Sequence, residues 1–125
     1  MAKNAETMSL NELYDGDLPD RDEMIWSFIS HDEADKQLTI ITIDPVVAYE
    51  TWVVDDGSTT VKEAFRDHAQ PWQKKLVASY RKDMHLADTI IVVAGELVVD
   101  GYHRIAALAK NKVRAVRALD LEEPA

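Results

Sequence analysis

The chain has 125 residues, enough for one hydrophobic core and too few for two ordinary domains. Hydrophobic residues make up 46% and charged residues 30%, which is typical of a globular rather than a disordered protein. There is no cysteine, which excludes disulfides and thiol chemistry and fits a reducing cytoplasm. No apolar signal segment or membrane-length run is present, so we expect a cytoplasmic chain with no membrane partner.

The formal net charge of −9 is unevenly distributed along the chain. Residues 1–36 contain 10 acids and 3 bases, whereas residues 37–125 contain 13 acids and 11 bases. We therefore divide the chain into an acidic N-terminal extension over 1–36, a nearly neutral domain over 37–121 that does not repel an anionic ligand, and a tail over 122–125. A protein partner that docks on this acidic extension is one alternative to a small ligand bound by the domain. The lack of a basic stripe argues against duplex DNA as a partner.

Two features are predicted within the extension. The segment from Ser9 to Glu12 has the form of a capping box and begins a short turn. Residues 20–30 begin with acids and then place apolar side chains at helical spacing. They predict one amphipathic helix.

The middle of the chain begins with a strong strand at residues 38–43, which Asp44-Pro45 ends because proline cannot continue a ladder of hydrogen bonds. Residues 46–54 fit both a helix and a strand. After a turn at residues 55–58, a second capping box, Thr60-Val61-Lys62-Glu63, begins a helix that reaches about His68.

Pro71 is predicted to begin the next helix, because proline suits a first helical position. The apolar face of this helix contains Trp72, Leu76, Val77 and Tyr80. Its opposite face carries basic residues, among them Lys74 and Lys75.

The last third of the chain predicts a hairpin, a helix and a strand. Residues 89–93 and 97–99 are β-branched runs that flank Ala94-Gly95-Glu96, a hairpin turn. Ile105, Leu108 and Ala109 then recur at helical spacing, so a helix is predicted there. Asn111 is predicted to end that helix in the left-handed conformation, and residues 113–119 are predicted to form the last strand. The predicted fold class is α+β, a small mixed sheet with packed helices and an added N-terminal helix.

The change from strand to helix falls on Asp100-Gly101. A glycine there permits a tight turn and leaves the first N–H groups of the helix open to an anion such as phosphate. His103 and Arg104, in the first helical turn, add side-chain donors. The alternative is purely structural, with Asp100 as an N-cap, Gly101 as a turn residue and the other two as a solvated first turn.

Residues 88–121, which contain this Asp-Gly-Tyr-His-Arg motif, resemble the core of the ParB/sulfiredoxin superfamily, and the pattern extends over residues 37–121. The resemblance implies a ParB/sulfiredoxin-like fold that binds a nucleotide (ATP, ADP or CTP) through Gly101, Tyr102, His103 and Arg104. Tyr102 stands where sulfiredoxins have their nucleophilic cysteine, which excludes reductase activity.

The motif from Val99 to Arg104 is most similar to the free-serine kinase branch of that superfamily. This likeness implies that Glu50, separated from Asp44 by five residues, acts on an acceptor hydroxyl, and that Asp100 positions the hydroxyl or a Mg²⁺ ion. The superfamily often offers a group to the phosphates from the helix before the hairpin, where Lys74 and Lys75 lie. The alternative for Glu50 and for the two lysines is a solvated surface position.

The resemblance predicts a nucleotide-binding protein that transfers a phosphoryl group to a small hydroxyl-bearing acceptor or hydrolyses the nucleotide. The alternative is a non-enzymatic regulatory module that binds a nucleotide or a partner. A ParB-like nuclease or DNA-partition role ranks third, because the turn lacks the partition proteins' Gly-Glu-Arg-Arg pattern and we expect no helix-turn-helix domain after it.

Overall fold

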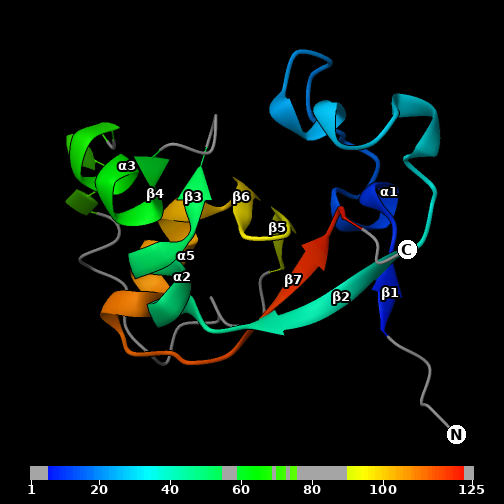
Figure 1. Cartoon of the computed structure of the whole chain (residues 1–125). Helices are drawn as coiled ribbons and strands as arrows, with labels where there is room; N and C mark the ends of the chain where they lie inside the picture. The colour runs from blue at the N-terminus through cyan, green and yellow to red at the C-terminus, as the bar shows by residue number, and fades with distance from the viewer. Residues whose placement is uncertain (1–5, 55–58, 69, 73, 76–89, 123–125) are drawn as a thin grey trace, which may run out of the picture.

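The computed structural model describes residues 6–54, 59–68, 70–72, 74–75 and 90–122. In these residues a mixed sheet of seven strands has the order β1-β2-β7-β5-β6-β3-β4 (Figure 1). The strands are β1 (Thr7–Met8), β2 (Leu38–Ile43), β3 (Val53–Val54), β4 (Thr59–Thr60), β5 (Ile91–Ala94), β6 (Leu97–Asp100) and β7 (Val116–Asp120). The predicted α+β class and mixed sheet are therefore confirmed.

Both parallel and antiparallel pairs occur in this sheet. The hairpin strands β5 and β6 are antiparallel, as are β2 and β7, whereas β5 runs parallel to β7 and β6 runs parallel to β3. Gly95, in the hairpin turn, has a φ of +61°, which is the positive value expected of a glycine in that position.

The described α-helices are α1 (Leu10–Leu13), α2 (Pro45–Thr51), α3 (Val61–His68) and α5 (Tyr102–Lys110). Both predicted capping boxes are confirmed: Ser9 Oγ accepts from the Glu12 amide, and Thr60 Oγ1 accepts from the Glu63 amide. Residues 46–54, which fit two patterns, contain the greater part of α2 and then β3.

The core lies on both faces of the sheet, because alternate residues of a strand point to opposite sides. On one side, which we call the helical face, Ile43, Val93 and Ala118 pack with residues of α2, α3 and α5. On the other, the N-terminal face, Leu38, Val92 and Leu119 pack with Leu10, Ile25 and Ile29 of the N-terminal segment. Figure 1 shows α1 and the chain that follows it on the side of the sheet away from α2, α3 and α5.

The helix predicted over residues 20–30 is wrong in kind and in extent. Only Met24–Ser27 is helical there, and it is a 3₁₀ helix, followed by a second one at His31–Glu33. Short helices receive little stability from their own hydrogen bonds, so packing decides their form. Here Trp26 Nε1 donates to the carbonyl of Pro19 at 3.1 Å and Ile25 is buried, which favours a compact turn.

Three smaller predictions are corrected. Asn111 has a φ of −93°, and Lys112, with a φ of +59°, is the left-handed residue that ends α5. The last strand begins at Val116 rather than at residue 113. Trp72, predicted on an apolar helix face, has 63% of its surface exposed. The predicted turn at residues 55–58, the hairpin residue Thr89, the helix beyond Lys75 and the tail over 123–125 lie outside the described residues.

Candidate functional site

The turn between β6 and α5 has the geometry that its sequence predicts. Asp100 is the last residue of β6, Gly101 has a φ of +109° and a ψ of 22°, and α5 begins at Tyr102. A residue with a side chain rarely adopts this left-handed conformation, so glycine is strongly favoured here. The structural alternative for Asp100 is wrong: the N-cap is Gly101, and no side chain caps this helix end.

The N-terminus of α5 differs from those of the other described α-helices. Ser9 caps α1, Asp44 caps α2 and Thr60 caps α3, each through a side-chain oxygen that accepts from backbone amides. Gly101 has no such oxygen. Because the first amides of a helix have no acceptor within the helix and carry partial positive charge, this end of α5 is suited to an anion.

Arg104 folds back over the turn. A Cβ atom added to Gly101 would lie 3.0 Å from Arg104 Nη2, so the guanidinium occupies the space that the glycine leaves. Nη1 donates to the carbonyl of Ile90 at 3.4 Å, and Nη2 lies 4.0 Å from Asp100 Oδ1. The side chain is 28% exposed and therefore less solvated than a freely extended first-turn arginine. Its charge stays beside the open end of α5.

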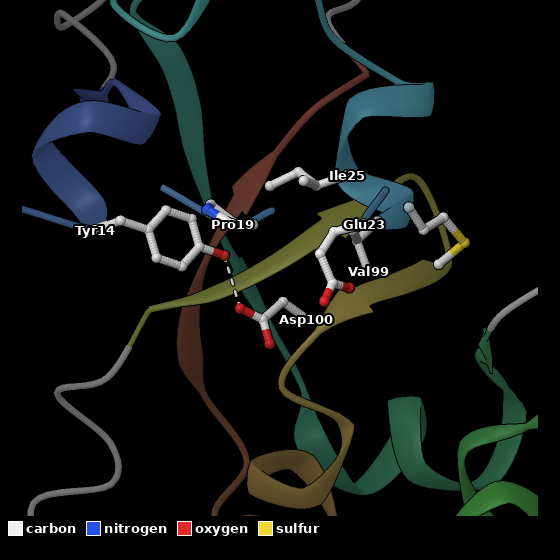
Figure 2. Close-up of a pocket in the computed structure, with 7 residues that line it drawn as sticks. Tyr14, Pro19, Glu23, Ile25, Val99 and Asp100 are labelled. Atoms are coloured by element: carbon white, nitrogen blue, oxygen red, sulfur yellow. Dashed lines mark hydrogen bonds between the residues drawn. The ribbon is translucent and has the colours of Figure 1, made fainter. Parts of the chain in front are cut away.

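Asp100 is held from the N-terminal segment by Tyr14, whose hydroxyl donates to Asp100 Oδ2 at 2.7 Å. Figure 2 shows the Tyr14 ring and the Glu23 carboxylate approaching Asp100 from two separate parts of that segment. Burial, and then the Asp100 carboxylate, raise the pKa of Tyr14, so the hydroxyl keeps its proton at neutral pH. Tyr14 lies 86 residues before Asp100, and no local pattern singled it out.

Two cavities flank this pair. The smaller, about 180 Å³, lies between Asp100, Tyr14 and the stretch from Pro19 to Ile25 (Figure 2). The larger, about 360 Å³, has Arg104, Asp100 and Glu12 as its charged lining residues, with Tyr14 beside them. Its apolar lining residues are Met8, Leu13 and Ile90. Arg104 therefore belongs both to the turn and to the larger cavity.

His103 faces a different neighbour from Arg104. Its ring centroid is 4.0 Å from that of Tyr102 and 6.1 Å from that of Phe65 on α3. Nε2 is buried and, among the described side chains, is the one buried polar atom without a hydrogen-bond partner. Burial lowers the pKa of His103, so the imidazole is predominantly neutral at pH 7.

The structure separates Glu50 from Asp44. Asp44 caps α2 and forms an ion pair with Arg114 at 2.7 Å, which lowers the pKa of its carboxyl group. Glu50 lies six residues later, about 9 Å farther along the helix axis. Both of its carboxylate oxygens are 3.2 Å from Lys62 Nζ on α3. Glu50 lines neither of the two cavities beside Asp100.

Lys74 and Lys75 are exposed residues in the helical segment after α3. Lys74 Nζ donates to the carbonyl of Arg66 at 2.6 Å, near the C-terminal end of α3. This contact resembles the capping of a helix C-terminus by a lysine and does not direct the ammonium group to the Gly101 turn.

Comparison of the chain with protein-family models, with curated proteins and with solved structures found no match. Within the described residues, no helix is long and apolar enough to cross a membrane.

Proposed function

We propose that the chain binds the phosphate groups of a nucleotide at the β6–α5 turn and that its fold is ParB/sulfiredoxin-like. The observation that carries the proposal is that α5 begins at a left-handed glycine with no side-chain cap, while the Arg104 guanidinium lies against that glycine. The amides of His103 and Arg104 at this uncapped helix end supply short-range donors, and the guanidinium supplies a charged, planar pair of donors for phosphate oxygens.

The unpaired Nε2 of His103 supports the same assignment. Buried polar atoms are nearly always hydrogen-bonded, and His103 Nε2, in the first turn of α5, lacks a partner, so it is available to a ligand. The Tyr102 and Phe65 rings fix the orientation of the imidazole.

Asp100 fits a Mg²⁺ ion that accompanies the nucleotide. Magnesium in phosphate sites binds through phosphate oxygens, several waters and only one or two carboxylates. The described residues contain no group of three or more metal-ligating side chains, so the phosphates and waters would complete the coordination. The accompanying metal would neutralise charge on the phosphates.

The enzymatic form of the proposal is phosphoryl transfer or hydrolysis. An acceptor oxygen attacks the terminal phosphorus, the bond from phosphorus to the leaving phosphate oxygen breaks, and the proton of the acceptor passes to a carboxylate. Resemblance assigns that last role to Glu50. For Glu50 to act, its ion pair with Lys62 must open.

A second candidate function is a nucleotide-binding regulatory module without turnover. The observation that favours it is the position of Glu50, which is held by Lys62 and lies outside both cavities beside Asp100. Both candidates use the same phosphate-binding turn, so they differ only in turnover.

Binding is tested by calorimetry with ATP, ADP, CTP and GTP in the presence of Mg²⁺. We expect at least one nucleotide to bind and to raise the Tm of the parent, because a ligand of the native state stabilises it. Arg104→Ala should weaken binding by about tenfold or more, since a charge-assisted hydrogen bond contributes about 1.5–3 kcal/mol. Arg117→Ala is the matched control, because Arg117 forms a surface ion pair with Glu6 instead.

Two outcomes would contradict the proposal: no nucleotide binds the parent, or Arg104→Ala binds as tightly as the parent while Tm and circular dichroism show it folded. Turnover then separates the two candidates. If Glu50 is a general base, Glu50→Gln should lower kcat by about 10²–10⁴-fold without loss of binding. If the parent turns over no nucleotide with any of a range of hydroxyl acceptors, the regulatory module replaces the enzyme.

A further inference from the structure

The larger cavity beside Asp100 is built from two distant parts of the chain. Met8, Glu12, Leu13 and Tyr14 of the N-terminal segment line it on one side. Ile90, Asp100 and Arg104 line it on the other. At about 360 Å³ it falls at the lower end of the size range of small-molecule pockets, about 300–1,000 Å³.

The cavity has one cationic and two anionic lining residues. Arg104 is the cationic lining residue and lies next to the Gly101 turn. Glu12 and Asp100 are both anionic, so a phosphate group is favoured near Arg104 and disfavoured near Glu12. The apolar side chains of Met8, Leu13 and Ile90 suit the uncharged part of a ligand, in the space between Arg104 and Glu12.

Glu12 is held in place as an acceptor. Its Oε1 accepts from Gln37 Nε2 at 2.7 Å and from the Ser9 amide at 2.9 Å, and these hydrogen bonds, the one from Gln37 first, lower the pKa of its carboxyl group. An ionised carboxylate accepts hydrogen bonds and cannot donate them. A ligand atom that reaches Glu12 must therefore carry a hydrogen.

Asp100 is oriented in a similar way. The Tyr14 hydroxyl donates a hydrogen bond to Asp100 Oδ2, while Oδ1 is the oxygen that faces Arg104. Tyr14 is thus a positioning residue: it lines both cavities and fixes the carboxylate between them.

We propose that this cavity binds the uncharged, donor-bearing body of an organic phosphate whose phosphate groups lie at the Gly101 turn. The inference rests on the proposed phosphate site and adds the N-terminal segment as the part that selects the ligand. A base with an amino group suits Glu12 better than one with a carbonyl oxygen in the same place.

The test compares three probes by calorimetry: inorganic tripolyphosphate, ATP, and inosine triphosphate, which has a carbonyl oxygen where ATP has an amino group. We expect ATP to bind the parent about tenfold more tightly than either of the others, the size of one hydrogen bond to a charged group. Glu12→Gln should remove most of the preference for ATP and leave tripolyphosphate affinity unchanged.

Glu33→Gln is the matched control. Glu33 also closes a capping box, with Ser30, but it does not line the cavity. A glutamine retains the capping interaction in both variants, so each is expected to fold. Equal effects of the two substitutions would overturn the inference.

Methionine methyl NMR signals give a second measurement on the unaltered chain. Met8 lines the larger cavity and Met24 lines the smaller one. ATP should shift the Met8 signal, tripolyphosphate should leave it in place, and Met24 should not respond to either. A shift of Met24 alone would place the ligand in the wrong cavity.

Failure of this inference differs from failure of the phosphate site. If tripolyphosphate binds in an Arg104-dependent way and ATP binds no more tightly, the cavity assignment is wrong and the phosphate site stands. If tripolyphosphate and ATP both fail to bind, both are wrong.

Discussion

The two faces of the sheet are covered in different ways. On the helical face, α2, α3 and α5 are each set by a signal within a few residues: Asp44-Pro45, the Thr60 capping box and Gly101. The N-terminal face is covered by α1, two 3₁₀ helices and irregular chain, yet it also contains buried side chains, among them Leu10, Ile25 and Ile29. Burial and regular secondary structure are therefore separate requirements, and a segment can complete a core without long helices.

The largest expected effect tests whether the N-terminal face carries as much stability as the helical face. Leu10 on α1 and Ile105 on α5 both have 0% exposed surface. We expect Leu10→Ala and Ile105→Ala each to lower the free energy of unfolding in urea by about 2–5 kcal/mol. Val47→Ala, at a residue 45% exposed, is the control and should change it by about 0.5 kcal/mol or less.

If Leu10→Ala cost less than about 1 kcal/mol while Ile105→Ala cost several, the N-terminal segment would be a loosely attached cover. The cavities beside Asp100 would then lack a firm wall on that side.

A second comparison separates backbone strain from phosphate binding. Gly101, with a φ of +109°, lies at the candidate site, and Gly16, with a φ of +80°, lies in the N-terminal segment. Either glycine replaced by alanine should lower the free energy of unfolding by about 1–3 kcal/mol, because the left-handed conformation disfavours a Cβ. Only at Gly101 would the new Cβ contact Arg104, whereas at Gly16 nothing lies within 4 Å.

Calorimetry with tripolyphosphate should therefore show weaker binding for Gly101→Ala and unchanged binding for Gly16→Ala. Equal affinities for the two variants would show that the shape of the Gly101 turn does not matter to the anion.

The smallest expected effect is a pH dependence from His103 on the helical face. Burial holds its pKa below 6.5 in the folded chain, so the unfolded chain takes up a proton first as the pH falls. The free energy of unfolding should be level above about pH 7 and should decline as the pH falls through 6.5 toward the lowered pKa.

Urea unfolding from pH 7.5 to pH 5.5 checks this sign. His103→Gln should flatten the decline, whereas His31→Gln, on the N-terminal face, should leave it in place. A decline of equal slope in His103→Gln would assign the effect to other groups.

Much of the helical face could be predicted from sequence because its determinants are local. Caps, the hairpin glycine and the Asp100-Gly101 turn each act over a few residues, and all lie close to their predicted places. The 3₁₀ helix at Met24–Ser27 could not be predicted in this way, since the same apolar spacing fits a longer helix and packing against the sheet selects the shorter one.

In the candidate site, too, the residues set by local sequence could be predicted and those set by long-range contacts could not. Sequence placed Asp100, Gly101, His103 and Arg104 at one turn, where the structure has them, and their role in binding stays a prediction. The sequence did not indicate Tyr14, because a hydrogen bond between residues 86 positions apart produces no local pattern or spacing. The capping box pointed to Glu12, but that pattern predicts only the start of a helix and not that Glu12 lines a cavity. Nor could spacing show that Lys62 would pair with Glu50.

The position of β7 has a consequence for how fast the chain folds. This strand, Val116–Asp120, comes last among the strands along the chain, yet it lies between β2 and β5 and pairs with both. The centre of the sheet therefore depends on a pairing between distant parts of the chain, such as Ile40 with Leu119. Contacts so distant in sequence slow folding, so β2 and β5 stay without their shared neighbour, and their apolar side chains stay exposed, until β7 docks between them.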